Sequence, residues 1–295
     1  MLHLKGQIKF VSIQNCQISR HVASVMILLA STIATEIYTI LDSVLLEYFH
    51  SEIYVGYYSN CVKMVRMIYA LSAAMAVTFY PRISLYLKKD RLDETNELIS
   101  KGFKVLLILA VPAAAGLFLT ADSLIPVLFG SSFLPSVGCL RILSVLVIVF
   151  SIAMILGHIV LMASGNEKRI LMASLYGASV NFALNVWLIP SYKHYGAALA
   201  SVLAELLVTG VLLKKSLKII KISIEKSFIS SLSISLIIMT TSIKIIDFWE
   251  ISPLKRLTLC IILNIITYLG ALIFFRNTII LYFCSKLQKI RGYVK

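Results

Sequence analysis

Long apolar stretches alternate with short charged connections along most of this chain. Eight of the stretches contain about the 20 mostly apolar residues that a helix needs to cross a bilayer. They cover residues 22–43, 57–80, 105–128, 138–162, 170–190, 195–213, 227–246 and 257–275. The pattern therefore predicts an all-α, polytopic integral membrane protein with about eight transmembrane helices. The second stretch is the least regular, because Lys63 and Arg66 interrupt it.

The connections divide the chain into a main lobe and a trailing pair of helices. We predict a cytoplasmic N-terminal segment at 1–21, a six-helix lobe at 22–213, a basic cytoplasmic linker at 214–226, two extra transmembrane helices at 227–275 and a basic cytoplasmic tail at 276–295. The mixed charges of residues 82–104 favour either an amphipathic helix on the membrane surface or a solvated helical loop. No connection is long enough for a soluble domain, so functional groups must lie within or beside the helices.

The composition supports a membrane protein, with 59% hydrophobic residues, 14% charged residues and a mean hydropathy of +0.90. Soluble domains usually carry about 25% charged residues. The net charge of +14 does not indicate nucleic-acid binding, because the Lys and Arg residues lie mostly in short connections between apolar stretches. Alternate connections are rich in them, and the positive-inside rule places such connections in the cytoplasm. Both termini are therefore predicted to be cytoplasmic.

The chain carries no sequence motif for an enzyme, a metal site or a nucleotide cofactor. The GxSxG, HExxH, GxGxxG and Walker A patterns are missing from it. Its five cysteines are widely spaced, and its five histidines lack metal-ligand spacing. We therefore expect a protein that is not an enzyme and that uses no metal or cofactor.

Several short patterns follow one another in an order and at a spacing shared with a known family of membrane proteins. They are LDSVLL at 41–46, VGYYSNCVKM at 55–64, TFYPRIS at 78–84, VPAAAGLFLTADSLIPVLFGSSFLPS at 111–136, GNEKR at 165–169, GASVNFALNVWLIP at 177–190 and YGAALASVLAE at 195–205. Each pattern alone is weak, and their succession carries the resemblance. The chain resembles the polysaccharide (O-antigen or capsule repeat-unit) flippases of the multidrug/oligosaccharidyl-lipid/polysaccharide exporter superfamily.

This resemblance implies that a lipid-linked oligosaccharide, carried on undecaprenyl pyrophosphate, is flipped across the bacterial inner membrane by alternating access. It also implies two six-helix lobes, often with two extra helices. The present chain resembles only the C-terminal lobe with the extra pair, so we expect a truncated or split transporter. Its partners would be membrane lipids and a separate N-terminal lobe or the polysaccharide polymerase machinery. The alternatives are a multidrug or lipid II exporter, or a non-transporting subunit of a polysaccharide assembly complex.

Three cations within the predicted helices are candidates for binding the phosphate or an acidic sugar of such a substrate. Lys63 and Arg66 are three residues apart and therefore share one side of a helix. A cation buried in a bilayer costs at least ~2.5 kcal/mol, so cations there usually face a bundle interior or a wet cavity. The alternatives to ligand binding are an ion pair with Glu36, snorkelling of the long side chains and a misplaced helix boundary. Arg141 is the third candidate, and snorkelling to the interface is its simpler role.

Three carboxyl groups are candidates for ion coupling or charge pairing. Glu36 is expected at the depth of Lys63 and Arg66, where it would pair with one of them or bind a coupling cation. Asp42 is expected at the outer end of its helix, where a solvated or helix-pairing carboxylate costs little. Glu205 lies in an apolar stretch, where it would bind a coupling proton or sodium ion or form a buried hydrogen bond.

Smaller features of the apolar stretches point to helix packing. Gly177, Asn181 and Asn185 repeat every four residues, and such a stripe of small and polar residues joins helices or lines a cavity. Pro112 is expected to kink its helix, which would serve alternating access. Tyrosines near the outer interface are expected to form an aromatic belt. They are Tyr54, Tyr57, Tyr58, Tyr192 and Tyr195.

Overall fold

The structure is a computed structural model that describes residues 18–247, 251–277 and 279–281. Residues 1–17 of the predicted N-terminal segment and residues 282–295 of the predicted C-terminal tail lie outside this part. All regular elements of the described part are helical, so the predicted all-α fold is confirmed. They are α1 Ile18–Phe49, α2 Glu52–Lys88, α3 Leu92–Phe129, η2 Ser131–Phe133, α4 Ser136–Ser144, α5 Leu146–Ala153, the π-helical η3 Met154–Leu161, α6 Glu167–Ser216, α7 Lys226–Asp247 and α8 Pro253–Phe274.

Six helical segments of the described part are long and apolar enough to cross a membrane, as a polytopic membrane protein requires. One of them, α6, has 50 residues. At 1.5 Å per residue it would extend about 75 Å, far more than the ~30 Å of a hydrocarbon core. Its backbone leaves the helical range at Lys193 (φ 53°, ψ −134°), so α6 consists of two helices that meet there. Helix α2, which carries Lys63 and Arg66, is not among the six. The total of eight crossings therefore stays a prediction.

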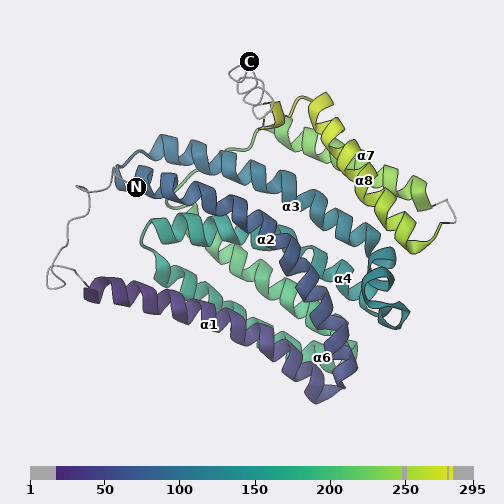
Figure 1. Ribbon diagram of the computed structural model, residues 1–295. Helices are drawn as coiled ribbons and strands as arrows, with labels where there is room; N and C mark the ends of the chain where they lie inside the picture. The colour runs from purple at the N-terminus through teal and green to yellow at the C-terminus, as the bar shows by residue number, and fades with distance from the viewer. Residues whose placement is uncertain (1–17, 248–250, 278, 282–295) are drawn as a thin grey trace, which may run out of the picture.

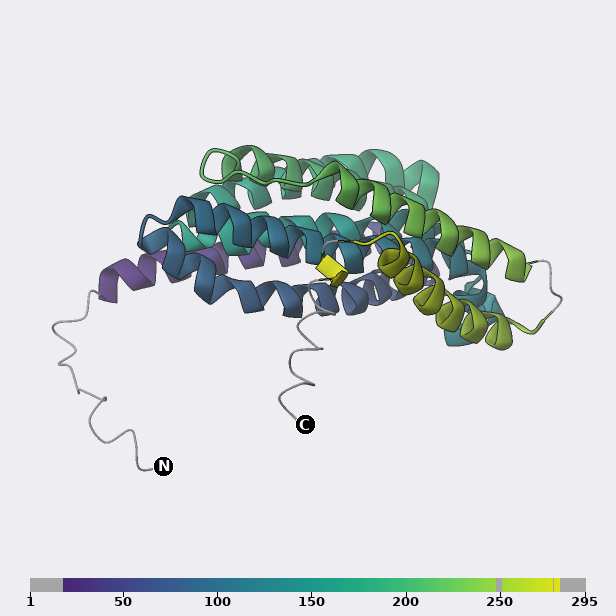
Figure 2. The same ribbon diagram turned by 90° about the horizontal axis from the view of Figure 1, so that it is seen from above.

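The helices run roughly along one another, and their connections alternate between the two ends of the bundle. The α1–α2 connection lies at one end and the α2–α3 connection at the other (Figure 1). Helix α3 separates two regions, with α1, α2, α4 and α6 on one side and α7 and α8 on the other (Figure 1). In the view from above, α7 and α8 lie next to each other at one end of the bundle (Figure 2).

The trailing pair of helices packs against α3 through its own apolar cluster. Val105 and Ile108 of α3 are buried against Phe228 and Met239 of α7 and against Tyr268 of α8. The hydroxyl of Tyr268 donates a hydrogen bond of 2.8 Å to the carbonyl oxygen of Ile108. The pair is therefore joined to the lobe by buried apolar contacts as well as by the linker.

Residues 82–104 are mostly helical, but they form neither one amphipathic helix nor one helical loop, so both predicted arrangements are wrong. Helix α2 continues to Lys88, and α3 begins at Leu92. Asp90, between them, has a positive φ of 59° and turns the chain. The charged residues of this region lie at the end of α2 and at the beginning of α3. Mixed charge suits the exposed end of any long helix that extends beyond the bilayer.

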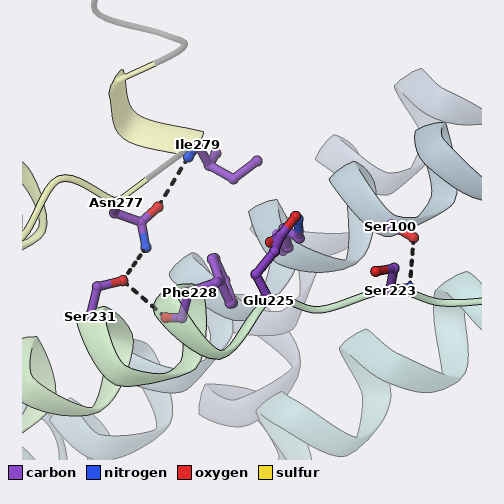
Figure 3. A network of polar contacts seen from close by, with 8 residues as sticks. Ser100, Ser223, Glu225, Phe228, Ser231, Asn277 and Ile279 are labelled. Atoms are coloured by element: carbon purple, nitrogen blue, oxygen red, sulfur yellow. Dashed lines mark hydrogen bonds and ion pairs between the residues drawn. The ribbon is translucent and has the colours of Figure 1, made fainter.

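The linker between α6 and α7 lies along the first turns of α3 and is held there by polar contacts (Figure 3). The backbone N–H groups of Lys221 and Ser223 donate to side-chain oxygens of α3, at 2.8 and 3.0 Å. Glu225 accepts a hydrogen bond from Lys104, whose side chain is only 7% exposed. This bond lowers the pKa of the Glu225 carboxyl group below its usual value.

The Lys104–Glu225 pair predicts a pH-dependent contribution to stability. We expect Glu225→Gln to lower the free energy of unfolding by about 1 kcal/mol at pH 7, since it leaves a buried cation without its charged partner while the exposed carboxylate is screened. A carboxyl group with a lowered pKa in the folded state stabilises it above the unfolded-state pKa, and this stabilisation is lost as pH falls through the folded-state value. The difference in melting temperature between wild type and Glu225→Gln should therefore shrink below pH 4.5. An equal difference at pH 7 and pH 3.5 would contradict this.

Candidate functional site

A cavity of about 700 Å³ lies between α1, α2, the α5–η3 run and both halves of α6. Its lining is mostly apolar, and four Asp, Glu or Arg side chains reach it. They are Glu36 and Asp42 of α1, Arg66 of α2 and Glu205 of α6. His158, on the π-helical η3, also lines the cavity, and π-helical turns are frequent at functional sites. Carboxyl groups outnumber cations on this wall.

Arg66 lines the cavity and makes two contacts with α1. Its Nη2 donates a hydrogen bond of 3.1 Å to Oγ1 of Thr39, and its Nη1 lies 3.7 Å from Oε2 of Glu36. The side chains of Arg66 and Glu36 are 43% and 53% exposed. The structure thus places Arg66 of α2 beside Glu36 of α1 on the cavity wall, with both side chains partly exposed.

The other two candidate cations lie elsewhere. Lys63 is exposed on α2 and is not part of the cavity wall, because residues three apart on a helix point about 60° away from each other. Arg141 pairs with Asp122 of α3 and lies 5.7 Å from the centre of the Phe118 ring. Of the three cations, the geometry therefore keeps only Arg66 as a residue that can contact a ligand in the cavity.

Asp42 is the centre of a buried polar cluster that joins four helical segments. Its Oδ2 accepts hydrogen bonds from the hydroxyls of Tyr58 at 2.5 Å and of Ser201 at 2.8 Å. Its Oδ1 accepts one from Nδ2 of Asn185 at 2.5 Å, and this nitrogen also donates to Oδ1 of Asn181 at 2.9 Å. The cluster links α1 and α2 to both halves of α6.

Asp42 is neither solvated nor at a helix end, so that part of the expectation is wrong, whereas the alternative of a helix-pairing residue agrees with its hydrogen bonds. Helix α1 continues to Phe49, two turns beyond the predicted boundary, so Asp42 is only 1% exposed. The expectation of an aromatic belt is also wrong for Tyr57 and Tyr58, which are 8% and 2% exposed, and Tyr58 is hydrogen-bonded to Asp42. A signal for this site was present in the sequence. Glu36, Thr39 and Asp42 are spaced by three residues, which places a polar stripe on one side of an otherwise apolar helix.

Glu205 is buried in the second half of α6 and reaches the same cavity. Tyr69 of α2 also lines the cavity, and its ring packs on Phe150 of α5 with 5.4 Å between the ring centres. Glu205 and Asp42 both lie on the cavity wall, but they belong to different helices. The structure therefore offers two carboxyl groups of low exposure on one cavity.

The predicted stripe of small and polar residues lies at a helix contact. Asn181 and Asn185 are fully buried in the cluster of Asp42. A Cβ added at Gly177 would lie 2.3 Å from Cγ2 of Val208, so glycine allows the two halves of α6 to approach closely. Helix α3 remains continuous through Pro112, and the residues that line the cavity include none from α3.

A group of aromatic side chains lies where α1 meets α2 and where α6 breaks. Tyr54 stacks on His194 with 5.7 Å between ring centres, and Tyr57 is buried beside the same histidine. Lys193 donates a hydrogen bond of 2.9 Å to the Tyr54 hydroxyl. Tyr192 is exposed, as a residue of an aromatic belt would be. The group holds the positive-φ break of α6 in place.

Comparison with known proteins supports the resemblance drawn from the sequence. Residues 11–138 match the sequence model of a family described as "Polysaccharide biosynthesis protein". Over 174 residues, the chain is 28% identical to the "Probable low-salt glycan biosynthesis flippase Agl15" of Haloferax volcanii. This alignment covers 59% of the present chain and 37% of Agl15.

Solved structures with the same fold are membrane transporters. The lipid II flippase MurJ, in an inward closed conformation, superposes with a TM-score of 0.71 at 20% identity, over 84% of this chain and 53% of MurJ. An outward-facing multidrug transporter of the MATE family superposes with a TM-score of 0.60 at 16% identity, over 87% of this chain and 65% of the transporter. The chain thus spans about a third to two thirds of the length of these relatives.

Proposed function

We propose that this chain, a relative of the polysaccharide flippase-type exporters, forms one wall of the path by which a lipid-linked oligosaccharide crosses a membrane. The partly exposed side chain of Arg66, which lines a cavity of about 700 Å³, carries this proposal. Arginine binds phosphate through two parallel N–H donors, and the pyrophosphate of a lipid carrier presents that geometry. The chain acts in transport and performs no covalent chemistry.

We further propose undecaprenyl-pyrophosphate-linked repeat units of an O-antigen or capsule as the substrate, in the bacterial inner membrane. The identity of the substrate and the identity of the membrane both rest on the family resemblance. A lipid-linked substrate also suits the cavity, because its apolar lining can accommodate the isoprenyl chain beside the headgroup. We also propose that the carboxyl groups of Glu36, Asp42 and Glu205 serve either coupling to a proton or a sodium ion or charge pairing.

The first test compares Arg66→Ala with Lys63→Ala, a matched variant of the same helix. Arg66→Ala should reduce surface polysaccharide at least tenfold in a strain that lacks other flippases, since it removes the phosphate contact. Lys63→Ala should leave polysaccharide near the wild-type level, because Lys63 is not on the cavity wall. Both proteins must be present at equal levels in the membrane fraction. Equal polysaccharide in both strains would contradict the proposed role of Arg66.

The excess of carboxyl groups on the cavity supports a second candidate, export of a cationic small molecule. Glu36, Asp42 and Glu205 would attract a cation, and this candidate predicts efflux of a cationic dye by cells that express the chain. Lipid-linked oligosaccharide flipping in liposomes, measured for the 295-residue chain alone and together with a separate N-terminal lobe, separates the candidates. It also tests the proposal that a separate N-terminal lobe is required, since flipping would then appear only with the partner.

A further inference from the structure

The contact between Arg66 and Glu36 is loose. A well-formed pair of arginine and carboxylate has two parallel hydrogen bonds of about 2.7–2.9 Å. Here Nη1 of Arg66 and Oε2 of Glu36 are 3.7 Å apart, beyond hydrogen-bonding distance. The hydrogen bond that Arg66 makes within the described residues goes to Thr39, at 3.1 Å. Glu36 therefore neutralises Arg66 by charge without occupying its N–H donors.

Both partners of this pair are accessible from the cavity. The side chains of Arg66 and Glu36 are 43% and 53% exposed, and both residues line the cavity. A phosphate group that enters the cavity can therefore reach the guanidinium and form two hydrogen bonds where Glu36 forms none. Glu36 can turn into the cavity when it is displaced, because half of its side chain is already exposed.

The other two carboxyl groups on the cavity wall, those of Asp42 and Glu205, cannot compete for Arg66. Asp42 is 1% exposed, and its oxygens accept hydrogen bonds from Tyr58, Asn185 and Ser201. Glu205 is 6% exposed and lies on α6, whereas the guanidinium contacts α1. Glu36 is thus the carboxylate placed to compete for Arg66.

We propose that Glu36 is a built-in competitor of the substrate's phosphate for Arg66 and thereby sets the affinity of the cavity for anionic headgroups. In the empty cavity Glu36 neutralises Arg66, and a bound phosphate displaces it. The inference rests on the proposed function, because it assumes that Arg66 binds the phosphate. Glu36 then limits the affinity of the cavity, which allows the bound headgroup to be released.

The test measures the affinity of the purified 295-residue chain, in nanodiscs of zwitterionic lipid, for geranyl pyrophosphate by ³¹P NMR titration. Glu36→Gln should bind it about two- to fivefold more tightly, the range expected for the loss of one half-exposed ion pair. Glu47→Gln is the matched control, an exposed glutamate of the same helix outside the cavity, and should bind as wild type does. Arg66→Ala should weaken binding at least fivefold, and Glu36→Gln added to it should gain nothing.

The outcomes separate this inference from the proposed function. Weaker binding by Arg66→Ala, with unchanged or weaker binding by Glu36→Gln, would overturn the competition and leave the role of Arg66 intact. Weaker binding by Glu36→Gln would mean that Glu36 positions the guanidinium. Unchanged binding by Arg66→Ala would overturn the phosphate site, and with it the competition. Tighter binding by Glu36→Gln that persists in the double variant would show a general charge effect and also overturn the competition.

Discussion

Replacement of Asp42 by alanine should lower the free energy of unfolding by about 2–3 kcal/mol. The change removes the acceptor for three buried donors, on Tyr58, Asn185 and Ser201. A buried donor left without an acceptor costs about 1–3 kcal/mol. The total is smaller than three such costs, because Ser201 also bonds to the Ala197 carbonyl and because membrane hydrogen bonds average only ~0.6 kcal/mol.

Thermal unfolding of the purified protein in detergent measures this effect. Asp42→Asn should be affected less, since an amide oxygen can still accept from Tyr58 or Ser201. Asp122→Ala is the matched control, because Asp122 forms an exposed pair with Arg141 that contributes at most ~1 kcal/mol. If Asp42→Ala melted at the same temperature as Asp122→Ala, the cluster would not stabilise the contact between α1, α2 and α6.

Replacement of Gly196 by alanine should destabilise the protein by about 3 kcal/mol, at the upper end of the usual cost of overpacking. A Cβ at this position would lie 2.5 Å from the carbonyl oxygen of Leu188 and 2.7 Å from its carbonyl carbon. These are backbone atoms, so no side-chain rotation can relieve the collision. Gly196 is close to Lys193, where α6 breaks, and the collision would push its two halves apart.

Gly210 provides the matched control on the same half of α6. A Cβ added at Gly210 meets nothing within 4 Å. Gly210→Ala should therefore leave stability unchanged or raise it by up to ~1 kcal/mol, because alanine favours helix over glycine. Melting temperatures and membrane expression levels of both variants test this prediction. If the two variants were equally stable, the two halves of α6 would tolerate a wider separation at the break.

Arg66 and Lys63 illustrate where prediction of the site from sequence ends. Their spacing of three residues shows that they lie on one side of α2, and the apolar surroundings indicate that such cations need a partner or water. The sequence is compatible with pairing of Glu36 to either cation. Only the packing of α1 against α2 decides that Arg66 lines the cavity beside Glu36 while Lys63 does not.

Local pattern determined the class of this protein. Apolar stretches of bilayer length specify helices, because a chain in lipid must satisfy its backbone hydrogen bonds within each segment. The same pattern, with the ordered motifs, was enough to predict an all-α polytopic membrane protein related to flippase-type exporters. The boundaries were less certain, since polar residues such as Asp42 look like a helix end when their partners are unknown.

The tertiary structure alone decided the chemistry of the site. Asp42 is bonded to Tyr58, Asn185 and Ser201, which lie 16, 143 and 159 residues away in the chain. No local pattern encodes contacts over such distances, because they depend on how α1, α2 and the two halves of α6 come together. The sequence by itself determined which helices form and which residues are costly to bury. Their packing decided which of those residues are paired with one another and which remain accessible to a ligand.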